Sequence, residues 1–197
     1  MIISPATMTV QEKEHLFSDL VMEWNKKINL VSRKKTDVCD LINESKIFFD
    51  FIDFEQNPTI LDLGTGGGFP GIVMKIYYPN IKLTLVDSIQ KKIKAVSDVS
   101  LRLGFKDVEI ICSRAEELKK NSVLQHTFDY IVARSVAPLY ELTKWSKELL
   151  KPSGKLITLK GGDLAEEVKR TNMQKFVKKL DILEKLDKKI IIAELQN

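Results

Sequence analysis

"ILDLGTGGGFPGI", residues 60–72, decides the fold of this 197-residue chain. A short apolar segment that contains Asp62 is followed by five of the chain's nine glycines, all within positions 64–71. Glycine tolerates positive φ and lets a ligand approach the backbone closely. A glycine-rich turn that leaves a strand and opens a helix is typical of a ligand site at the carboxyl end of the strand.

The pattern on the carboxyl side of this stretch predicts an α/β fold. Strands and helices alternate after Pro58, which implies a mostly parallel, doubly wound sheet with right-handed crossovers. A basic helix and a closing antiparallel hairpin around Asp187 complete the chain. The expected strands are residues 59–64, 82–87, 108–113, 129–135 and 155–161, the expected helices are 71–78, 88–104, 139–150 and 163–179, and the expected hairpin strands are 180–186 and 188–195.

Residues 1–57 have a different pattern and predict a helical cap. Thr9 and Glu12 have the spacing of a capping box, which starts a helix with one apolar face. A second helix is expected after Thr36. Asn57-Pro58 ends this portion, so we expect two units: the helical cap at 1–57 and a cofactor-binding domain at 58–197.

Composition limits the class of protein. The chain has a net charge of +4, and 44% of its residues are hydrophobic, an ordinary value for a globular domain. It contains no apolar run long enough to span a bilayer, no signal-peptide pattern and no metal-ligand spacing. We therefore expect a cytoplasmic protein that neither associates with a membrane nor binds a metal. Its two cysteines, Cys39 and Cys112, are expected to be reduced and buried.

The glycine loop and one later acid predict a nucleoside-containing cofactor. Gly64, Gly66 and Gly68 form the loop, and Asp87 ends the second strand, where a carboxylate can accept hydrogen bonds from ribose hydroxyls. The same loop also satisfies the G-x-G-x-x-G pattern of dinucleotide sites. The motif by itself therefore leaves two cofactor classes open.

Three features favour S-adenosylmethionine (SAM). Asp62 stands two residues before the loop, where its carboxylate can reach the ammonium group of SAM, directly or through water; a dinucleotide has no such group. Ala115 and Glu116 follow the third strand, where they can contact an adenine ring and its amino group. The chain is also too short for the usual second catalytic domain of a dehydrogenase.

The chain resembles the glucose-inhibited division protein B family, which are bacterial methyltransferases that modify guanine N7 in small-subunit ribosomal RNA. The SAM loop is common to many methyltransferases, whereas "FPG", "ARSVAPL" and "WNKKINLVSR" are more particular. The resemblance covers most of the chain in the family's order. The stretches that carry it are "WNKKINLVSRKK", "LDLGTGGGFPGI", "TLVDSIQKKIKAV", "CSRAEE", "FDYIVARSVAPL" and "GKLITLKGG".

The resemblance implies a Rossmann-like class I SAM-dependent methyltransferase fold, with SAM as cofactor and small-subunit ribosomal RNA or a ribosomal particle as partner. One departure is Leu41, which stands where the family often has a histidine. The positions that match the family's site are Gly64 and Phe69 in the cofactor loop, Asp87 at the ribose, Ala115 and Glu116 at the adenine, and Arg134 at the mouth of the fourth strand.

The residues after the fourth strand favour a nucleophile that needs no base. Ala133-Arg134-Ser135-Val136 lacks the Asn/Asp-Pro-Pro-aromatic motif of exocyclic-amine methyltransferases. Neither cysteine is placed to attack a pyrimidine. Guanine N7 carries a lone pair and no proton, so positioning would supply most of the acceleration. Arg134 is the candidate catalytic residue, because arginine can hydrogen-bond guanine O6. Its alternative role is an ion pair with a neighbouring acid.

Contacts with RNA phosphates are expected from basic residues. The main candidates are Arg33, Lys34, Lys35 and Lys160. Further candidates are Lys26 and Lys27 and the run Lys169, Arg170, Lys175, Lys178 and Lys179. A solvated surface is the alternative interpretation, since acids are interleaved with the basic residues. No heptad pattern suggests a dimer, so we expect a monomer. Two other functions stay open at this stage: an NAD(P)-binding oxidoreductase, and a non-catalytic RNA-binding or assembly protein that retains a SAM fold.

Overall fold

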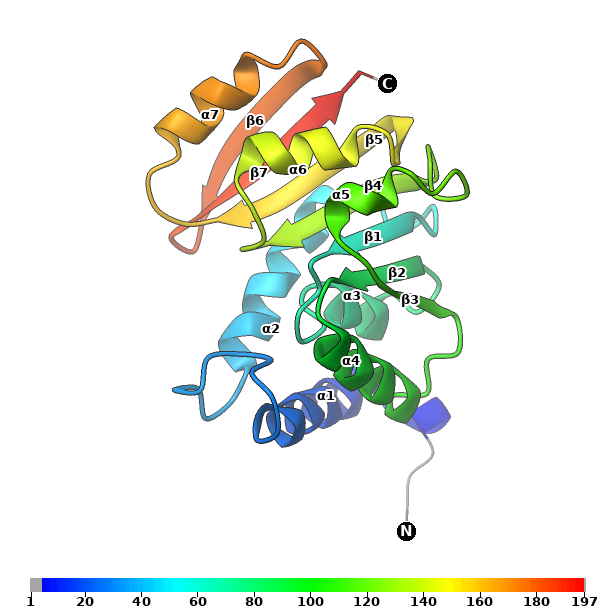
Figure 1. Ribbon diagram of the computed structural model, residues 1–197. Helices are drawn as coiled ribbons and strands as arrows, with labels where there is room; N and C mark the ends of the chain where they lie inside the picture. Colours follow the sequence, from blue (N-terminus) through cyan, green and yellow to red (C-terminus); the bar gives the residue numbers. More distant parts are fainter. Residues whose placement is uncertain (1–4, 197) are drawn as a thin grey trace.

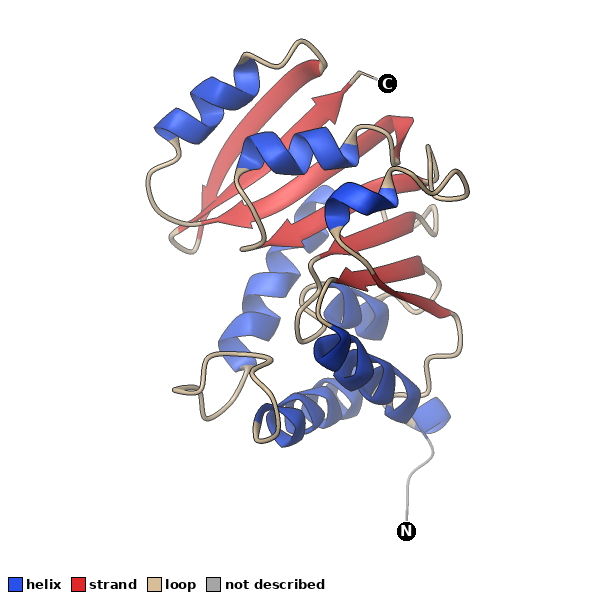
Figure 2. Ribbon diagram, in the orientation of Figure 1, coloured by secondary structure: helices blue, strands red, loops and turns tan. Residues whose placement is uncertain are grey.

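The computed structural model describes residues 5–196, which form three layers with a seven-stranded sheet in the middle (Figures 1 and 2). The strand order is β3-β2-β1-β4-β5-β7-β6. The strands are β1 (Thr59–Leu63), β2 (Lys82–Asp87), β3 (Val108–Cys112), β4 (Phe128–Arg134), β5 (Leu150–Lys160), β6 (Val177–Lys185) and β7 (Lys188–Leu195).

The first five strands are parallel, and β7 pairs antiparallel with both β5 and β6. The predicted mostly parallel Rossmann-like sheet and its closing antiparallel hairpin are therefore confirmed. Strand order reverses between β1 and β4, which places a crevice for ligands at the carboxyl ends of these strands. The turn between β6 and β7 also lies at the carboxyl ends of the parallel strands, because Lys160 at the end of β5 pairs with Lys189 near the start of β7.

Helices cover both faces of the sheet (Figure 2). One face packs against α1 to α4, and the other packs against α5 and α6, with α7 over the closing strands. The helices are η1 (Pro5–Thr7), α1 (Val10–Asn25), α2 (Cys39–Lys46), η2 (Ile47–Phe51), α3 (Gly71–Tyr77), α4 (Gln90–Arg102), α5 (Ala115–Leu118), α6 (Leu139–Ser146) and α7 (Ala165–Asn172).

The helices of residues 5–57 share one apolar core with the cofactor domain. The predicted capping box starts α1, where Thr9 Oγ1 accepts a hydrogen bond from the backbone N–H of Glu12. Phe17 of α1 is fully buried, and its ring lies 5.0 Å from that of Phe69 in the glycine-rich loop. Leu41, at the position of the family histidine, is buried in the same core. The division at residue 57 stays a prediction, and in packing terms the two parts are continuous.

Three expectations are wrong. The helix expected at 139–150 ends at Ser146, and the strand expected at 155–161 already begins at Leu150. The basic helix expected at 163–179 is only Ala165–Asn172, and the chain then turns into β6, so Lys178 and Lys179 lie on an edge strand. Cys39 and Cys112 are free, as expected, but both are exposed rather than buried. Cys39 is the first residue of α2 and Cys112 is the last of β3, and side chains at such ends face solvent more readily than those at mid-element.

Within residues 5–196, no helix has both the length and the apolar character needed to cross a membrane. The same residues contain no cluster of three or more His, Cys, Asp or Glu side chains arranged to hold a metal ion.

Candidate cofactor cleft and active site

The loop after β1 is tied to β2 by its backbone. The N–H groups of Gly64 and Thr65 both donate to the carbonyl of Val86, at 2.9 and 2.8 Å. Gly64 has φ +77°, and a Cβ there would lie 2.6 Å from Cγ2 of Val136. Only glycine meets both requirements without strain. The glycine therefore lets the segment after β4 pack directly on the loop after β1.

Asp62 is the internal support of this loop. Its side chain is fully buried, and Oδ2 accepts hydrogen bonds from Thr65 Oγ1 at 2.7 Å and from the Gly71 N–H at 2.9 Å. Burial raises the pKa of Asp62 to about 6, although these hydrogen bonds and the charge of Arg134 act in the opposite direction. The other oxygen, Oδ1, is buried without a hydrogen-bond partner among the described residues.

Asp87 supports the loop from the neighbouring strand. One of its oxygens accepts the Gly66 N–H at 3.0 Å, and the other accepts the Ile89 N–H at 2.9 Å. The side chain is only 7% exposed, yet it lines an open cleft at the carboxyl ends of the strands. Each oxygen has a second lone pair, so Asp87 can accept a ligand's hydroxyl groups while it still holds the loop.

The cleft has a volume of about 350 Å³, which suits a small-molecule cofactor. Asp87 and Glu116 provide carboxylate acceptors, and Ile89 and Val136 provide exposed apolar surface. Its lining comprises Leu63, Gly64, Val86, Asp87, Ser88, Ile89, Lys92, Ser113, Arg114, Ala115, Glu116, Ser135, Val136 and Trp145.

These donors and acceptors fit SAM. Acceptors beside apolar walls suit ribose hydroxyls and an adenine ring. The predicted contact of Asp62 with the ammonium group of SAM stays a prediction, because this side chain is fully buried outside the cleft lining. The cleft brings Gly64, Asp87, Ala115 and Glu116 together, as the sequence predicts for a cofactor site. Asp62, Gly66 and Gly68 lie behind the cleft, in the loop that shapes it.

Phe69 is placed differently from the sequence expectation of a cofactor contact. Its side chain is only 2% exposed and lies in the core against Phe17, outside the cleft lining. The guanidinium carbon of Arg134 lies 5.5 Å from the centre of the Phe69 ring, a cation–π distance. Phe69 thus supports the arginine, and its role as a cofactor contact stays a prediction.

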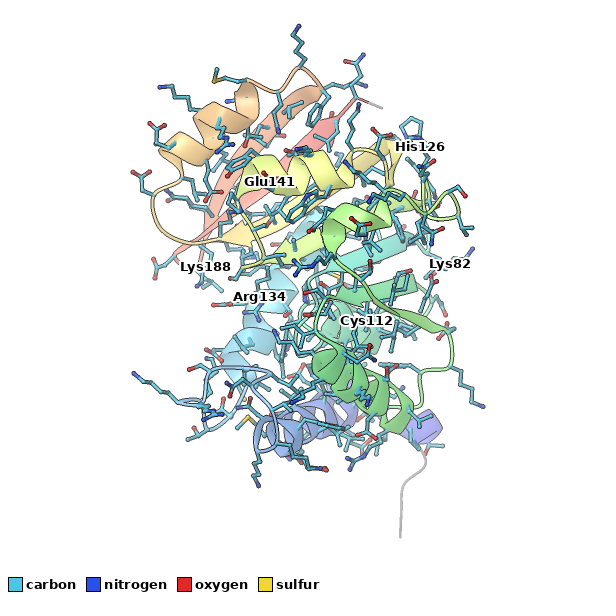
Figure 3. The ribbon with its side chains drawn as sticks, in the orientation of Figure 1. Lys82, Cys112, His126, Arg134, Glu141 and Lys188 are labelled. Carbon is cyan, nitrogen blue, oxygen red and sulfur yellow. The ribbon has the colours of Figure 1, made fainter. Side chains whose placement is uncertain are left out.

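Arg134, the last residue of β4, is predicted as a cofactor contact as well as a catalytic residue, but it is not among the residues that line the cleft, and the cofactor contact stays a prediction. It forms the ion pair that was its alternative role. Its Nη1 lies 3.2 Å from Oε2 of Glu44 on α2, and the other oxygen of Glu44 lies 3.1 Å from Nζ of Lys188. Figure 3 shows Arg134 and Lys188 at the same edge of the molecule. The Nε of Arg134 is buried without a partner among the described residues, so the guanidinium keeps an unused donor.

The predicted basic residues differ in their surroundings. Lys35 pairs with Asp40, and Lys160 is 11% exposed, with its Nζ 2.6 Å from Glu167 Oε2 and 2.8 Å from the carbonyl of Ala137. Lys160 is thus already neutralised inside the fold. A hollow of about 460 Å³ lies beside the basic loop after α1 and is lined by Met22, Asn25, Lys26, Lys27, Ile28, Arg33 and Lys35.

Sequence reasoning missed several cleft residues. Ser113 follows β3 and Ser135 follows β4, so the rule that strand ends meet at one edge could have found both. Ser135 has φ +56°, an unusual conformation for a residue other than glycine, and it turns the chain back over the loop. Trp145 comes from the last turn of the amphipathic helix α6, where no local sequence signal separates a cleft residue from a core residue.

Comparisons with known proteins agree with this geometry. The family model described as rRNA small subunit methyltransferase G matches residues 10–191. A protein named Ribosomal RNA small subunit methyltransferase G from Chlorobaculum tepidum is 44% identical over 154 residues, which is 77% of this chain and 69% of that protein. One of the same name from Alkaliphilus metalliredigens is 35% identical over 161 residues, which is 79% of this chain and 66% of that protein.

The chain thus spans about two thirds of the length of the curated relatives it matches. A solved structure of a SAM-dependent methyltransferase from Aquifex aeolicus has a TM-score of 0.63 at 18% identity, covering 88% of this chain and 97% of that one. Such a likeness shows the fold, which is that of the class I SAM-dependent methyltransferases.

Replacing Asp87 with asparagine should weaken SAM binding by about 1–3 kcal/mol, because one charged acceptor of a largely buried site is lost. Isothermal titration calorimetry measures the affinity directly. Asp129→Asn is the matched control, since Asp129 also accepts a backbone N–H, from Thr59 at 2.9 Å, but lies at the other end of the strands. Equal SAM affinity in a folded Asp87→Asn protein and the wild type would remove Asp87 from the cofactor site.

Asp62 should make folding stability depend on pH. Its pKa is about 6 in the folded protein and near 4 when unfolded, so the folded state binds the extra proton between these values. The resulting stabilisation is fully present below about pH 4 and is lost as the pH rises through 6. Urea unfolding should show Asp62→Asn gaining stability relative to wild type over this range, by about 3 kcal/mol at most. A pH-independent difference would mean that Asp62 titrates normally.

Proposed function

This chain belongs to the rRNA small subunit methyltransferase G family, and on that premise we propose that it transfers a methyl group from SAM to N7 of a guanine in small-subunit ribosomal RNA. The observation that carries the proposal is the juxtaposition of the SAM cleft with Arg134 at the end of β4. Ser135 and Val136, the next two residues, line the cleft itself. We propose that the protein acts in the cytoplasm and as a monomer.

The residues of the cleft would hold the cofactor from three strand ends. Asp87 would accept the ribose hydroxyls, and Ala115 with Glu116 would contact the adenine. SAM, when bound, supplies an electrophilic methyl group. The apolar surface of Ile89 and Val136 would exclude water from one side of the site. The protein's main task is then to bring a nucleophile into line with the methyl group, since alignment of this kind can supply most of the acceleration.

A base-free nucleophile fits the described residues. The chain's two histidines both lie away from the cleft. His15 is 84% exposed on α1, and His126 precedes β4, at the opposite ends of the strands from Arg134 (Figure 3). Neither exposed cysteine lines the cleft. Guanine N7 needs no proton acceptor, so the absence of these groups from the cleft is no obstacle. The Arg134 side chain is 18% exposed and Glu44 holds only its Nη1, so the guanidinium keeps donors for the guanine O6.

The loop between α1 and α2 is the proposed phosphate-binding surface. Lys26, Arg33 and Lys34 have no carboxylate within ion-pair distance among residues 5–196, so their charges are available to RNA. Lys26 and Arg33 border the hollow beside α1, and Arg33 is fixed by a hydrogen bond of 2.6 Å from Nε to Asn29 Oδ1. Lys35 contributes less net charge, because Asp40 neutralises it. This surface is a stronger candidate than the internally paired Lys160.

The family and the fold remove the support for an NAD(P)-binding oxidoreductase, which rested on the glycine pattern alone. A non-catalytic RNA-binding protein differs from the proposal in one measurable respect, the transfer of a methyl group. Small subunits, and RNA extracted from them, from cells that lack this methylation should accept label from radioactive SAM, and chemical cleavage at 7-methylguanine should locate it. No incorporation into either substrate, by protein that binds SAM, would contradict the proposed activity.

We expect Arg134→Ala to slow single-turnover methylation by about 100-fold while SAM affinity stays unchanged, because the guanine loses an orienting donor. Arg134→Lys should recover little, since a point charge cannot replace the planar guanidinium. His15→Ala and His126→Ala should have wild-type rates with no essential base titrating between about pH 6 and 8. A rate that collapses in either histidine variant, in folded protein that binds SAM, would indicate a nucleophile that must lose a proton.

The pair Arg33→Ala and Lys34→Ala should lower RNA affinity and reduce the slope of log affinity against log salt by about 1 to 2, with SAM affinity unchanged. Lys175→Ala with Lys178→Ala is the matched control, since it removes the same charge from the chain around the start of β6, at the far edge of the sheet. Filter binding over a salt series gives both slopes. If the two double variants have the same slope, the loop carries no specific phosphate contact.

A further inference from the structure

Glu44 joins three parts of the molecule that are distant in sequence. It lies on α2 of the cap, its Oε2 is 3.2 Å from Nη1 of Arg134 on β4, and its Oε1 is 3.1 Å from Nζ of Lys188 on β7. Glu44 and Arg134 are 21% and 18% exposed, so water screens this pair less than an exposed surface pair. The carboxylate is thus shared between two cations, one of them at the mouth of the active site.

We propose that Glu44 is a positioning residue for methyl transfer, which acts by fixing the plane of the Arg134 guanidinium against the ring of Phe69. This inference rests on the proposed function of Arg134. Two contacts define the guanidinium: the Glu44 carboxylate at its edge and the Phe69 ring 5.5 Å from its central carbon. Because Phe69 belongs to the cofactor loop, the orientation of the arginine is tied to the position of the cofactor.

The donors of Arg134 show why such fixing matters. Glu44 accepts from Nη1 while the side chain stays 18% exposed, so one part of the planar group is held and another is left to contact a base. An arginine side chain has several rotatable bonds, and a guanidinium that rotates freely cannot hold the base in the alignment that methyl transfer requires. Holding one end of the guanidinium reduces this cost before RNA binds.

The contact of Glu44 with Lys188 determines which substitutions test the role of Glu44. A glutamine at position 44 offers only one carbonyl oxygen, so its amide group must face either Arg134 or Lys188. Both neighbours are hydrogen-bond donors, and an amide N–H cannot accept from them. Glu44→Gln therefore keeps the size of the side chain but breaks the double contact. Glu44→Asp keeps the charge and should restore part of the function.

A second ion pair between the cap and the hairpin provides a matched control. Asp50 of η2 pairs with Lys185, at the end of β6 beside the same hairpin turn. Asp50→Asn should loosen the contact between these elements much as Glu44→Gln does, but it leaves Arg134 untouched. A role in general cap stability would affect both variants alike, whereas a positioning role would affect only Glu44→Gln.

The decisive experiment is a double-mutant cycle measured by single-turnover methylation. Glu44→Gln should slow the wild-type enzyme about tenfold or more, with SAM affinity unchanged, but should cause no further loss in the Arg134→Ala background. Glu44→Asp should recover part of the rate, and Asp50→Asn should match the wild type. Equal losses in both backgrounds, equal losses in Glu44→Gln and Asp50→Asn, or an unchanged rate in Glu44→Gln would each overturn the positioning role.

The same assays separate this inference from the proposed function. Wild-type protein that binds SAM but methylates no RNA would overturn the proposed activity, and the role of Glu44 with it. Wild-type methylation combined with any of the contrary results above would overturn only the role of Glu44. Melting temperatures of all variants, compared with Asp50→Asn, identify any loss of rate that comes from unfolding.

Discussion

Two carboxylates at the ends of adjacent parallel strands hold the glycine-rich loop, and the rest of the site depends on them. Asp62 accepts hydrogen bonds from Thr65 and Gly71, and Asp87 accepts one from Gly66. Side chains from β1 and β2 therefore fix the loop at three positions. A glycine loop left to itself would lose much conformational entropy on ordering. The fold meets this cost by anchoring the loop to acids that are themselves buried.

The two acids differ in how strongly burial disfavours their ionised forms. Asp62 is fully buried and has a raised pKa, which means that its ionised form is disfavoured when no cation faces it. Asp87 is at the wall of the cleft, where ligand hydroxyls can satisfy its remaining lone pairs. Asp62 can therefore act on a ligand only through the loop that it supports, whereas Asp87 can contact the ligand directly.

The sequence was sufficient to predict the local elements and less informative about side-chain partners. Strand ends, the loop and the hairpin around Asp187 follow from apolar runs and turn residues, which act over a few positions. The helix expected at 163–179 fails because β6 gains more from pairing with β7 than Lys175 to Lys179 gain from helical propensity. Arg134 and Glu44 are 90 residues apart, and Phe69 contacts Phe17, which lies 52 positions before it. Local patterns do not encode such long-range contacts.

The cap is better understood as part of the site than as an appendage. Its buried Phe17 supports Phe69, Phe69 lies beneath Arg134, and Glu44 of the cap holds the same arginine from the side. The cap therefore supports the arginine in two ways: directly, through the ion pair with Glu44, and indirectly, through the contact of Phe17 with Phe69. The basic loop joins α1 to α2, so a protein that binds RNA through this loop would place the RNA relative to Arg134 through both helices. In such an arrangement, the geometry of substrate delivery depends on the packing of two short helices, and a small shift of the cap would be felt directly at the arginine.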